Sequence, residues 1–205
     1  MKILKRVSGN LPVNSYFIVN EETNEGFVID GGVSAEGVLA FAKENNINLT
    51  AMLLTHTHYD HATCSYDLQK AGLKIIVAEK EKDGLYDKTI NLTSFVNVEF
   101  PPLEADQTFV DGEEFTVAGI TVKAMLTPGH TKGSTCFIIG NNLFAGDTIL
   151  EHVIGRTDLK TGSRVELMAS LKKLRALEEN YNVYSGHGED STLEFEKTYN
   201  PFMAR

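Results

Sequence analysis

The chain has 205 residues, of which 42% are hydrophobic and 23% are charged, and its formal net charge is −9. This length and composition predict one soluble domain covering residues 1–205. The acidic balance repels phosphate backbones and excludes the polyanion-binding class, so we expect no nucleic acid partner.

The first half of the chain predicts alternating strands and helices, which is typical of the α/β class. The strands that we expect there cover 2–8, 15–20, 26–30, 50–55 and 74–78. The helices that we expect cover 34–45 and 61–71, with one or two short helices within 80–96.

The second half is rich in strands. Those that we expect cover 109–111, 114–117, 120–126, 134–140, 143–146 and 182–185, the first two joined by a turn at Asp111-Gly112. Ser163-Arg164-Val165-Glu166 has the form of a capping box and predicts a helix that runs to about Asn180. A short helix is predicted over 191–198.

An apolar strand followed by a histidine loop occurs once in each half. The first copy is Ala51-Met52-Leu53-Leu54-Thr55-His56, and the second is Ala124-Met125-Leu126-Thr127-Pro128-Gly129-His130. We therefore expect two similar layers that meet at a shared site.

The cysteine content, the N-terminal segment and the length of the apolar runs all favour a cytoplasmic protein. Cys64 and Cys136 are too few for a disulfide framework and fit a reducing environment. We expect both to pack as small hydrophobic residues. The segment Met1–Arg6 lacks the apolar core of a signal peptide. No apolar run reaches the length of a membrane span, so we expect no membrane association.

The segment Thr55–His61 carries three imidazoles and a carboxylate directly after an apolar strand. Burying such groups without partners costs several kcal/mol. A transition metal supplies the partners, because neutral imidazole and carboxylate suit zinc, iron or manganese. Side chains alternate in an extended segment, so His56 and His58 project to the same side and reach one ion. Asp60 and His61 point differently, as a second ion requires.

Three further segments carry donors at strand ends or in glycine-containing loops. We interpret seven side chains as metal ligands, namely His56, His58, Asp60, His61, His130, Asp147 and His187. The glycines Gly186 and Gly188 allow backbone near a crowded centre. Asp30 is expected to orient a ligand or to tie down a turn.

Four motifs together resemble the metallo-β-lactamase superfamily: Thr55–His61, Pro128-Gly129-His130-Thr131, Gly146-Asp147 and Gly186-His187-Gly188. The resemblance implies a four-layer αβ/βα sandwich in which two central mixed sheets are flanked by helices and the metals lie at one edge. Within the superfamily, Gly155-Arg156-Thr157-Asp158 and Tyr199-Asn200-Pro201-Phe202 make the chain most similar to the short glyoxalase II-like (hydroxyacylglutathione hydrolase-like) enzymes.

The resemblance also implies a ligand assignment and a reaction. One divalent ion is held by His56, His58 and His130, the other by Asp60, His61 and His187, with Asp147 bridging. Zinc is the expected ion, with iron or manganese as alternatives. Such a pair lowers the pKa of water from about 15.7 toward about 7 and supplies a bridging hydroxide for attack on a thioester carbonyl. A thiolate leaves without a general acid, and Asp60 can steer the hydroxide proton.

Several alternatives stay open at this stage. The segment after His187 is shorter than the helical domain with which full-length glyoxalase II enzymes grip glutathione, so another small thioester or ester is a candidate substrate. A mononuclear-iron persulfide dioxygenase would use His56, His130 and Asp147. Two further interpretations are a lactonase or other esterase, and a non-catalytic module with a structural metal. Two ions per chain favour hydrolysis, whereas one iron favours the dioxygenase.

Three more residues are ambiguous from sequence. Arg156 has the charge to bind a substrate carboxylate, but it can equally pair with Asp158. Tyr59 is a candidate for the pocket entrance. His152 lies outside every motif, and we expect it at the surface or behind a ligand.

Overall fold

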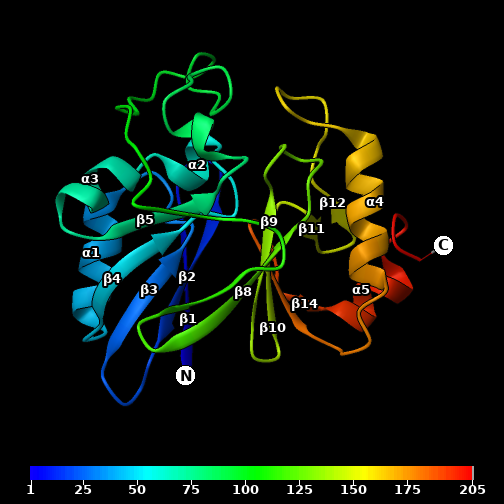
Figure 1. Cartoon of the computed structure of the whole chain (residues 1–205), viewed down its shortest axis with the longest axis horizontal. Coiled ribbons are helices and arrows are strands. Elements are labelled where there is room, and N and C mark those ends of the chain that lie inside the picture. Colours follow the sequence, from blue (N-terminus) through cyan, green and yellow to red (C-terminus); the bar gives the residue numbers. More distant parts are fainter. Residues whose placement is uncertain (205) are drawn as a thin grey trace.

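Two six-stranded sheets form the centre of the computed structural model, which describes residues 1–204 (Figure 1). In the first sheet the neighbouring strands follow chain order: β1 (Lys2–Ser8), β2 (Val13–Val19), β3 (Glu25–Ile29), β4 (Asn48–Leu53), β5 (Lys74–Ala78) and β6 (Gln107–Phe109). The β1–β2 and β2–β3 pairs are antiparallel, whereas the pairs from β3 to β6 are parallel. The sheet is therefore mixed.

The second sheet is also mixed. Its spatial order is β14 (Ser191–Thr192), β13 (Asn182–Ser185), β10 (Asn142–Gly146), β9 (Thr135–Ile139), β8 (Ile120–Leu126) and β7 (Glu114–Val117). The β10–β13 pair is parallel and the others are antiparallel. A small hairpin of β11 (Ile149–Leu150) and β12 (Val153–Ile154) follows β10.

Helices cover the outer face of each sheet (Figure 1). On the first sheet these are α1 (Ala35–Glu44) and α3 (Ser65–Lys70), and on the second α4 (Arg164–Arg175) and α5 (Leu193–Tyr199). The period-two alternation of strands makes this possible. In β2, Phe17 faces the helices of the first sheet, whereas Ile18 packs between the two sheets. Three apolar layers result, and the predicted αβ/βα sandwich is confirmed.

The helix predicted over 61–71 is wrong in one respect, because it is two short helices, α2 (Tyr59–Ala62) and α3. The break lies at Cys64, whose backbone N–H donates to the Gly32 carbonyl at 3.1 Å. In return, the Gly32 N–H donates to the His61 carbonyl at 3.0 Å. The Cys64 N–H and the His61 carbonyl are therefore bonded to a distant loop. They cannot form the i to i−4 hydrogen bonds that one continuous helix would need.

Other differences also reflect contacts between segments that are distant in sequence. Ser163 caps α4 as predicted, accepting from the Glu166 N–H at 3.3 Å, but the helix ends at Arg175 rather than near Asn180. The Asn180 side chain instead accepts from the Glu194 N–H at 3.0 Å, which holds the chain against α5. Residues 80–96 contain one 3-10 helix, η1 (Lys82–Leu85), and turns.

The turn at Asp111-Gly112 does not close a hairpin. It connects β6 at the edge of the first sheet to β7 at the edge of the second. Strands β4, β8, β10 and β13 lie within these two sheets, and the segments that follow them carry the histidine and aspartate motifs. Within residues 1–204, no helix combines the length and apolar character needed to cross a bilayer.

Candidate metal centre

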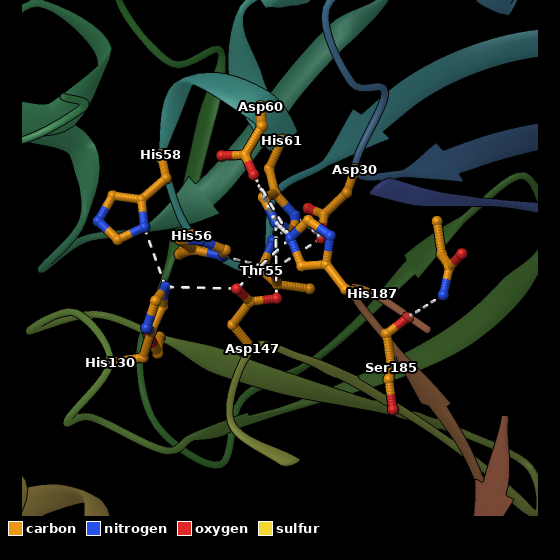
Figure 2. Close-up of polar contacts among 12 residues, drawn as sticks. Asp30, Thr55, His56, His58, Asp60, His61, His130, Asp147, Ser185 and His187 are labelled. Atoms are coloured by element: carbon orange, nitrogen blue, oxygen red, sulfur yellow. Dashed lines mark hydrogen bonds and ion pairs between the residues drawn. The ribbon is translucent and has the colours of Figure 1, made fainter. Parts of the chain in front are cut away.

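Seven histidine and aspartate side chains from four segments converge between the two sheets (Figure 2). We call them the donor set: His56, His58, Asp60, His61, His130, Asp147 and His187. His56, His58 and His130 form a first group, in which each residue offers a ligand atom within 4.8 Å of the others. The closest pair is His58 Nδ1 and His130 Nε2, at 2.9 Å.

Asp60, His61 and His187 form a second group by the same measure. His61 Nε2 lies 3.2 Å from His187 Nε2, and Asp60 Oδ2 lies 3.4 Å from the same His187 atom. The two groups contain the same residues that sequence spacing and family resemblance assigned to two separate ions.

Asp147 lies between the two groups (Figure 2). Its Oδ2 is 3.6 Å from His130 Nε2 of the first group and 3.6 Å from His187 Nε2 of the second, while its Oδ1 is 3.6 Å from His61 Nε2. A carboxylate in this position can contribute one oxygen to each of two ions. The β10 strand and the positive-φ residue Gly146 direct it there.

Three imidazoles have their outer nitrogen bound to an oxygen acceptor. His130 Nδ1 donates to the Arg156 carbonyl at 2.8 Å, and His187 Nδ1 donates to the Pro12 carbonyl at 2.6 Å. A carbonyl only accepts, so the hydrogen lies on Nδ1 and the inner Nε2 presents a lone pair when the ring is neutral. His61 Nδ1 contacts Asp30 Oδ2 at 2.9 Å in the same way. Such outer partners orient the ligands of metal sites.

Unpartnered buried atoms test whether a metal fits this arrangement. His56 Nε2 and Asp147 Oδ1 are buried without a hydrogen-bond partner, although buried polar atoms are nearly always paired. His56 and His58 stay neutral because burial and the neighbouring imidazoles hold the pKa of each well below its usual value. Neutral imidazoles and carboxylates without a thiolate suit zinc, iron or manganese. The donor set therefore fits a binuclear site.

His61 is the one imidazole of the donor set that carries a strong cationic bias. Burial opposes its ionisation, but Asp147, Asp30 and Asp60 raise the pKa of His61 to about 10. A proton is therefore held where a cation is electrostatically favoured. Metal binding at the second group would release this proton, as is general for histidine ligands.

Asp30 was expected to orient a ligand or to tie down a turn, and its contacts are with Thr55 and with His61 of the donor set. Its carboxylate accepts from the Thr55 backbone N–H at 2.9 Å, from Thr55 Oγ1 at 2.7 Å and from His61 Nδ1. Asp30 also forms a third group with His56 and His61, but its Oδ2 contacts the outer nitrogen of His61, while the Nδ1 of His56 contacts Thr55 Oγ1 at 3.1 Å. Asp30 therefore supports the donor set from behind.

Sequence reasoning missed Glu81, which is fully buried. Its Oε1 accepts from Thr57 N at 3.1 Å and from Thr57 Oγ1 at 2.8 Å. Its Oε2 accepts from Thr131 Oγ1 and Gly133 N, both at 2.9 Å. Glu81 therefore fastens the His56–His58 segment to the His130 loop. Burial raises the pKa of its carboxyl, and these four donors offset part of that effect.

The His187 loop is held by residues from the start of the chain, which sequence reasoning also missed. Asn14 Nδ2 donates to the carbonyls of Ser185 and Gly188, both at 2.9 Å. Gly186 is required by close approach, because a Cβ there would lie 2.3 Å from Asp147 Oδ1. An asparagine inside the apolar strand β2 is the only sequence signal that pointed to this role.

A pocket of about 400 Å³ opens over the donor set. Beyond five donors of the set, it is lined by Tyr59, by Arg156 and by six apolar residues that we call the apolar rim: Leu11, Pro12, Leu92, Phe95, Val96 and Leu159. The Arg156 guanidinium makes two 2.8 Å hydrogen bonds to Asp158. Of the two roles considered from sequence, the Arg156 side chain therefore has the ion pair with Asp158. Its backbone carbonyl accepts the hydrogen bond from His130.

The remaining candidates lie away from the pocket. Cys64 is buried in the apolar layer under α1, with its Sγ 3.9 Å from Met52 Sδ, and Cys136 is buried in strand β9. Both pack as the sequence predicted. His152 is exposed and packs beside the Phe195 ring.

Comparisons with known proteins agree with this geometry. The family model described as Metallo-beta-lactamase superfamily matches residues 8–187. A protein of Streptococcus pyogenes named "probable metallo-hydrolase" is 32% identical over 99% of this chain and 90% of its own length. The crystal structure of the BLEG-1 B3 metallo-beta-lactamase is similar with a TM-score of 0.93 and 29% identity, covering all of both chains. TTHA1623 in a di-iron-bound form has a TM-score of 0.86 and 28% identity, covering 97% of this chain and 99% of its own.

Proposed function

The chain belongs to the metallo-beta-lactamase superfamily, and we propose that this metal-dependent hydrolase cleaves small thioesters, as glyoxalase II-like enzymes do. The observation that carries the proposal is the convergence of all seven members of the donor set in two groups, with Asp147 between them. Every ligand position that the resemblance implies is filled, and each position lies within reach of a shared centre.

The chain's residues would hold the ions as follows. The first group would hold one ion and the second group the other, with Asp147 contributing to both. We propose zinc or iron, because the donors are nitrogen and oxygen and a structurally similar protein binds two irons. Two divalent ions, when bound, supply a water of lowered pKa and a Lewis acid for the substrate carbonyl.

Asp60 is the residue that we propose steers the proton of the nucleophile. Burial opposes ionisation, but His61 and His187 hold the pKa of its carboxyl well below the usual range. The carboxylate therefore stays ionised at neutral pH, and it lines the pocket. An ionised carboxylate accepts a hydrogen bond from the nucleophilic water and so orients its proton, in addition to serving as a ligand.

The side chains that line the pocket restrict which leaving groups can depart, because a leaving group that needs a proton requires an acid nearby. Outside the donor set, Tyr59 and Arg156 are the lining side chains that carry a proton. Burial and Asp60 raise the pKa of Tyr59, and Asp158 raises that of Arg156, so both are weak acids. A thiol has a pKa of about 8.5 and departs as thiolate without a proton. An amine needs a proton, so the pocket favours a thioester over a lactam.

A mononuclear-iron persulfide dioxygenase is the principal alternative. It would use His56, His130 and Asp147 and would leave the second group idle. His61 and His187 are nevertheless oriented by Asp30 and by the Pro12 carbonyl as firmly as His130 is by Arg156. Orientation of both groups favours two ions and hydrolysis.

Metal analysis and activity on one sample test the proposal. Protein purified without added metal is loaded with zinc or, anaerobically, with ferrous iron, and the bound ions are counted by mass spectrometry. We expect two ions per chain and hydrolysis of S-acyl thioesters. One iron per chain, with oxygen uptake on glutathione persulfide and no thioester cleavage, would establish the dioxygenase instead. A chromogenic cephalosporin and a simple lactone serve as the other substrates.

A further inference from the structure

We propose that the acyl group of the thioester is an apolar chain of several carbons, bound by the apolar rim, rather than a small hydroxyacyl group. This inference rests on the thioester hydrolysis proposed above and names the substrate class of that same site. In the reaction, the acyl C–S bond breaks and a C–O bond to water forms. The products are the apolar carboxylate, the thiol form of the carrier and a proton released to solvent.

The composition of the pocket outside the donor set is the first argument. Six of the eight remaining lining residues are apolar, and they come from the β1–β2 turn, from residues 92–96 and from the loop at Leu159. The other two are Tyr59 and Arg156. Since the carbonyl of the substrate must reach the donor set, the groups attached to it contact this apolar surface. Burying them there is favourable in proportion to their apolar area.

The polar groups of the pocket are a poor match for a hydroxyacyl-glutathione. The Arg156 guanidinium already uses two of its five N–H donors on the oxygens of Asp158, so its charge is paired before any substrate carboxylate arrives. Tyr59 is the other polar lining residue outside the donor set. A hydroxyl or carboxylate placed against the apolar rim would lose water without a dedicated partner, which is costly.

Exposure of large apolar side chains that line the pocket is the second argument. Phe95 is 78% exposed and Leu11 is 51% exposed. A single exposed hydrophobic residue is ordinary. Two that border the same apolar pocket form a surface that a ligand can cover, which is the usual meaning of such patches.

Backbone strain at Leu92 is the third argument and is independent of the other two. Leu92 has a φ of 70°, which a non-glycine residue rarely adopts. The flanking residues hold it there: the buried Asn91 side chain donates to the Gly84 carbonyl at 2.7 Å and accepts from Thr93 Oγ1 at 2.7 Å. The Asn91 carbonyl also accepts from the Tyr59 N–H at 2.9 Å. Strain of this kind clusters at ligand clamps, and here it presents a leucine to the pocket.

The test uses the full chain loaded with zinc and a series of thioesters that differ only in the acyl group. The acetyl, butyryl, hexanoyl and lactoyl thioesters of N-acetylcysteamine are compared, and kcat/KM is measured from the release of the thiol. Each buried methylene is expected to raise kcat/KM about two- to four-fold. The hexanoyl ester should therefore exceed both the acetyl ester and the lactoyl ester by at least about tenfold.

Two variants separate the apolar rim from the rest of the fold. Leu92→Asn keeps the size of the side chain and relieves the strain, because asparagine adopts positive φ readily. Phe95→Ser removes a side chain that is already exposed. We expect both proteins to be as stable as the parent, with the hexanoyl-to-acetyl ratio reduced at least about threefold. Val165→Ser, on an 81% exposed position of α4, is the matched control and should keep the ratio.

The outcomes distinguish this inference from the proposed function. Thioester cleavage with no dependence on acyl length, or with the lactoyl ester preferred over the hexanoyl ester, overturns the apolar substrate class and leaves the thioesterase standing. An unchanged ratio in Leu92→Asn and Phe95→Ser overturns the role of the apolar rim. Loss of every thioester activity in the zinc-loaded parent overturns the proposed function itself.

Discussion

The donor set and the apolar rim are adjacent, but they are built in different ways. His61, His130 and His187 are fixed from behind by Asp30 or by backbone carbonyls, and the centre is largely buried. The apolar rim is partly exposed, and its most constrained member, Leu92, is held by strained backbone rather than by packing. Changes in the donor set should therefore affect metal binding and activity together, whereas changes in the apolar rim should affect substrate choice alone.

Removal of the metal should have the largest effect on activity, and it should act on the donor set without changing the apolar rim. Chelation should abolish hydrolysis completely, because the pocket offers no other activated nucleophile among the residues that line it. The three apolar layers do not depend on the ions, so the far-ultraviolet circular dichroism should persist. Stability should fall by about 2.7 kcal/mol for each ion supplied at 100 times its Kd. Restoring zinc should recover activity, and failure to do so would count against a metal-dependent mechanism.

Asp147→Asn should have the next largest effect. The substitution removes the charge that lies 3.6 Å from His61, His130 and His187 and serves both groups. We expect kcat/KM to fall by at least about 10³-fold, with fewer than two ions bound per chain. Asp158→Asn is the control, because that carboxylate pairs with Arg156 at the surface. Full activity with two bound ions in Asp147→Asn would contradict a bridging role.

Asp30→Asn tests the support behind the donor set. Asparagine tolerates the φ of 53° at this position, so the backbone should be unchanged. With its oxygen accepting from the Thr55 N–H, its amide nitrogen would face His61 Nδ1–H, and two donors would meet. His61 must then move its hydrogen to the inner nitrogen, which weakens a ligand. We expect a loss of about 10- to 100-fold in metal affinity or activity. Asp67→Asn, at an exposed position of α3, is the control and should cause no loss.

The donor set could be predicted from sequence because its residues are chemically rare and follow apolar strands. Alternation placed His56 and His58 on the same side, and the order of the motifs supplied the remaining positions. The two-layer hypothesis drawn from the repeated strand–histidine pattern is also confirmed, because β4 and β8 lie in different sheets.

The supports behind the donor set could not be predicted, because they join segments that are distant in sequence. Asn14 and Ser185 are 171 positions apart, and no periodicity links them. Glu81 lies in the charged run Glu79-Lys80-Glu81-Lys82, which is typical of a solvated surface, yet its side chain is fully buried. The apolar rim was missed for a related reason: its members come from three loops with no shared motif.

Glu81→Gln should affect stability more than activity. Both carboxylate oxygens accept from a backbone N–H, one from Thr57 and the other from Gly133. An amide nitrogen must oppose one of these fixed donors, which leaves a buried N–H unsatisfied. We expect a cost of about 1–3 kcal/mol, with Tm lowered by about 2–4 °C for each kcal/mol. Metal content should be retained, since no member of the donor set contacts Glu81. The exposed neighbour variant Glu79→Gln should leave Tm unchanged.

Arg156→Ala should have the smallest effect and decides between the two roles that the sequence left open. The backbone carbonyl that holds His130 is kept, and the ion pair with Asp158 is exposed and screened by solvent, so its loss should not disturb the fold. We expect unchanged metal content and less than about a threefold change in kcat/KM, equal for neutral and anionic thioesters. Asp158→Ala frees the guanidinium and should improve anionic substrates selectively. If Arg156→Ala instead impaired only the anionic thioesters, the guanidinium would be a substrate-binding group despite its pairing with Asp158.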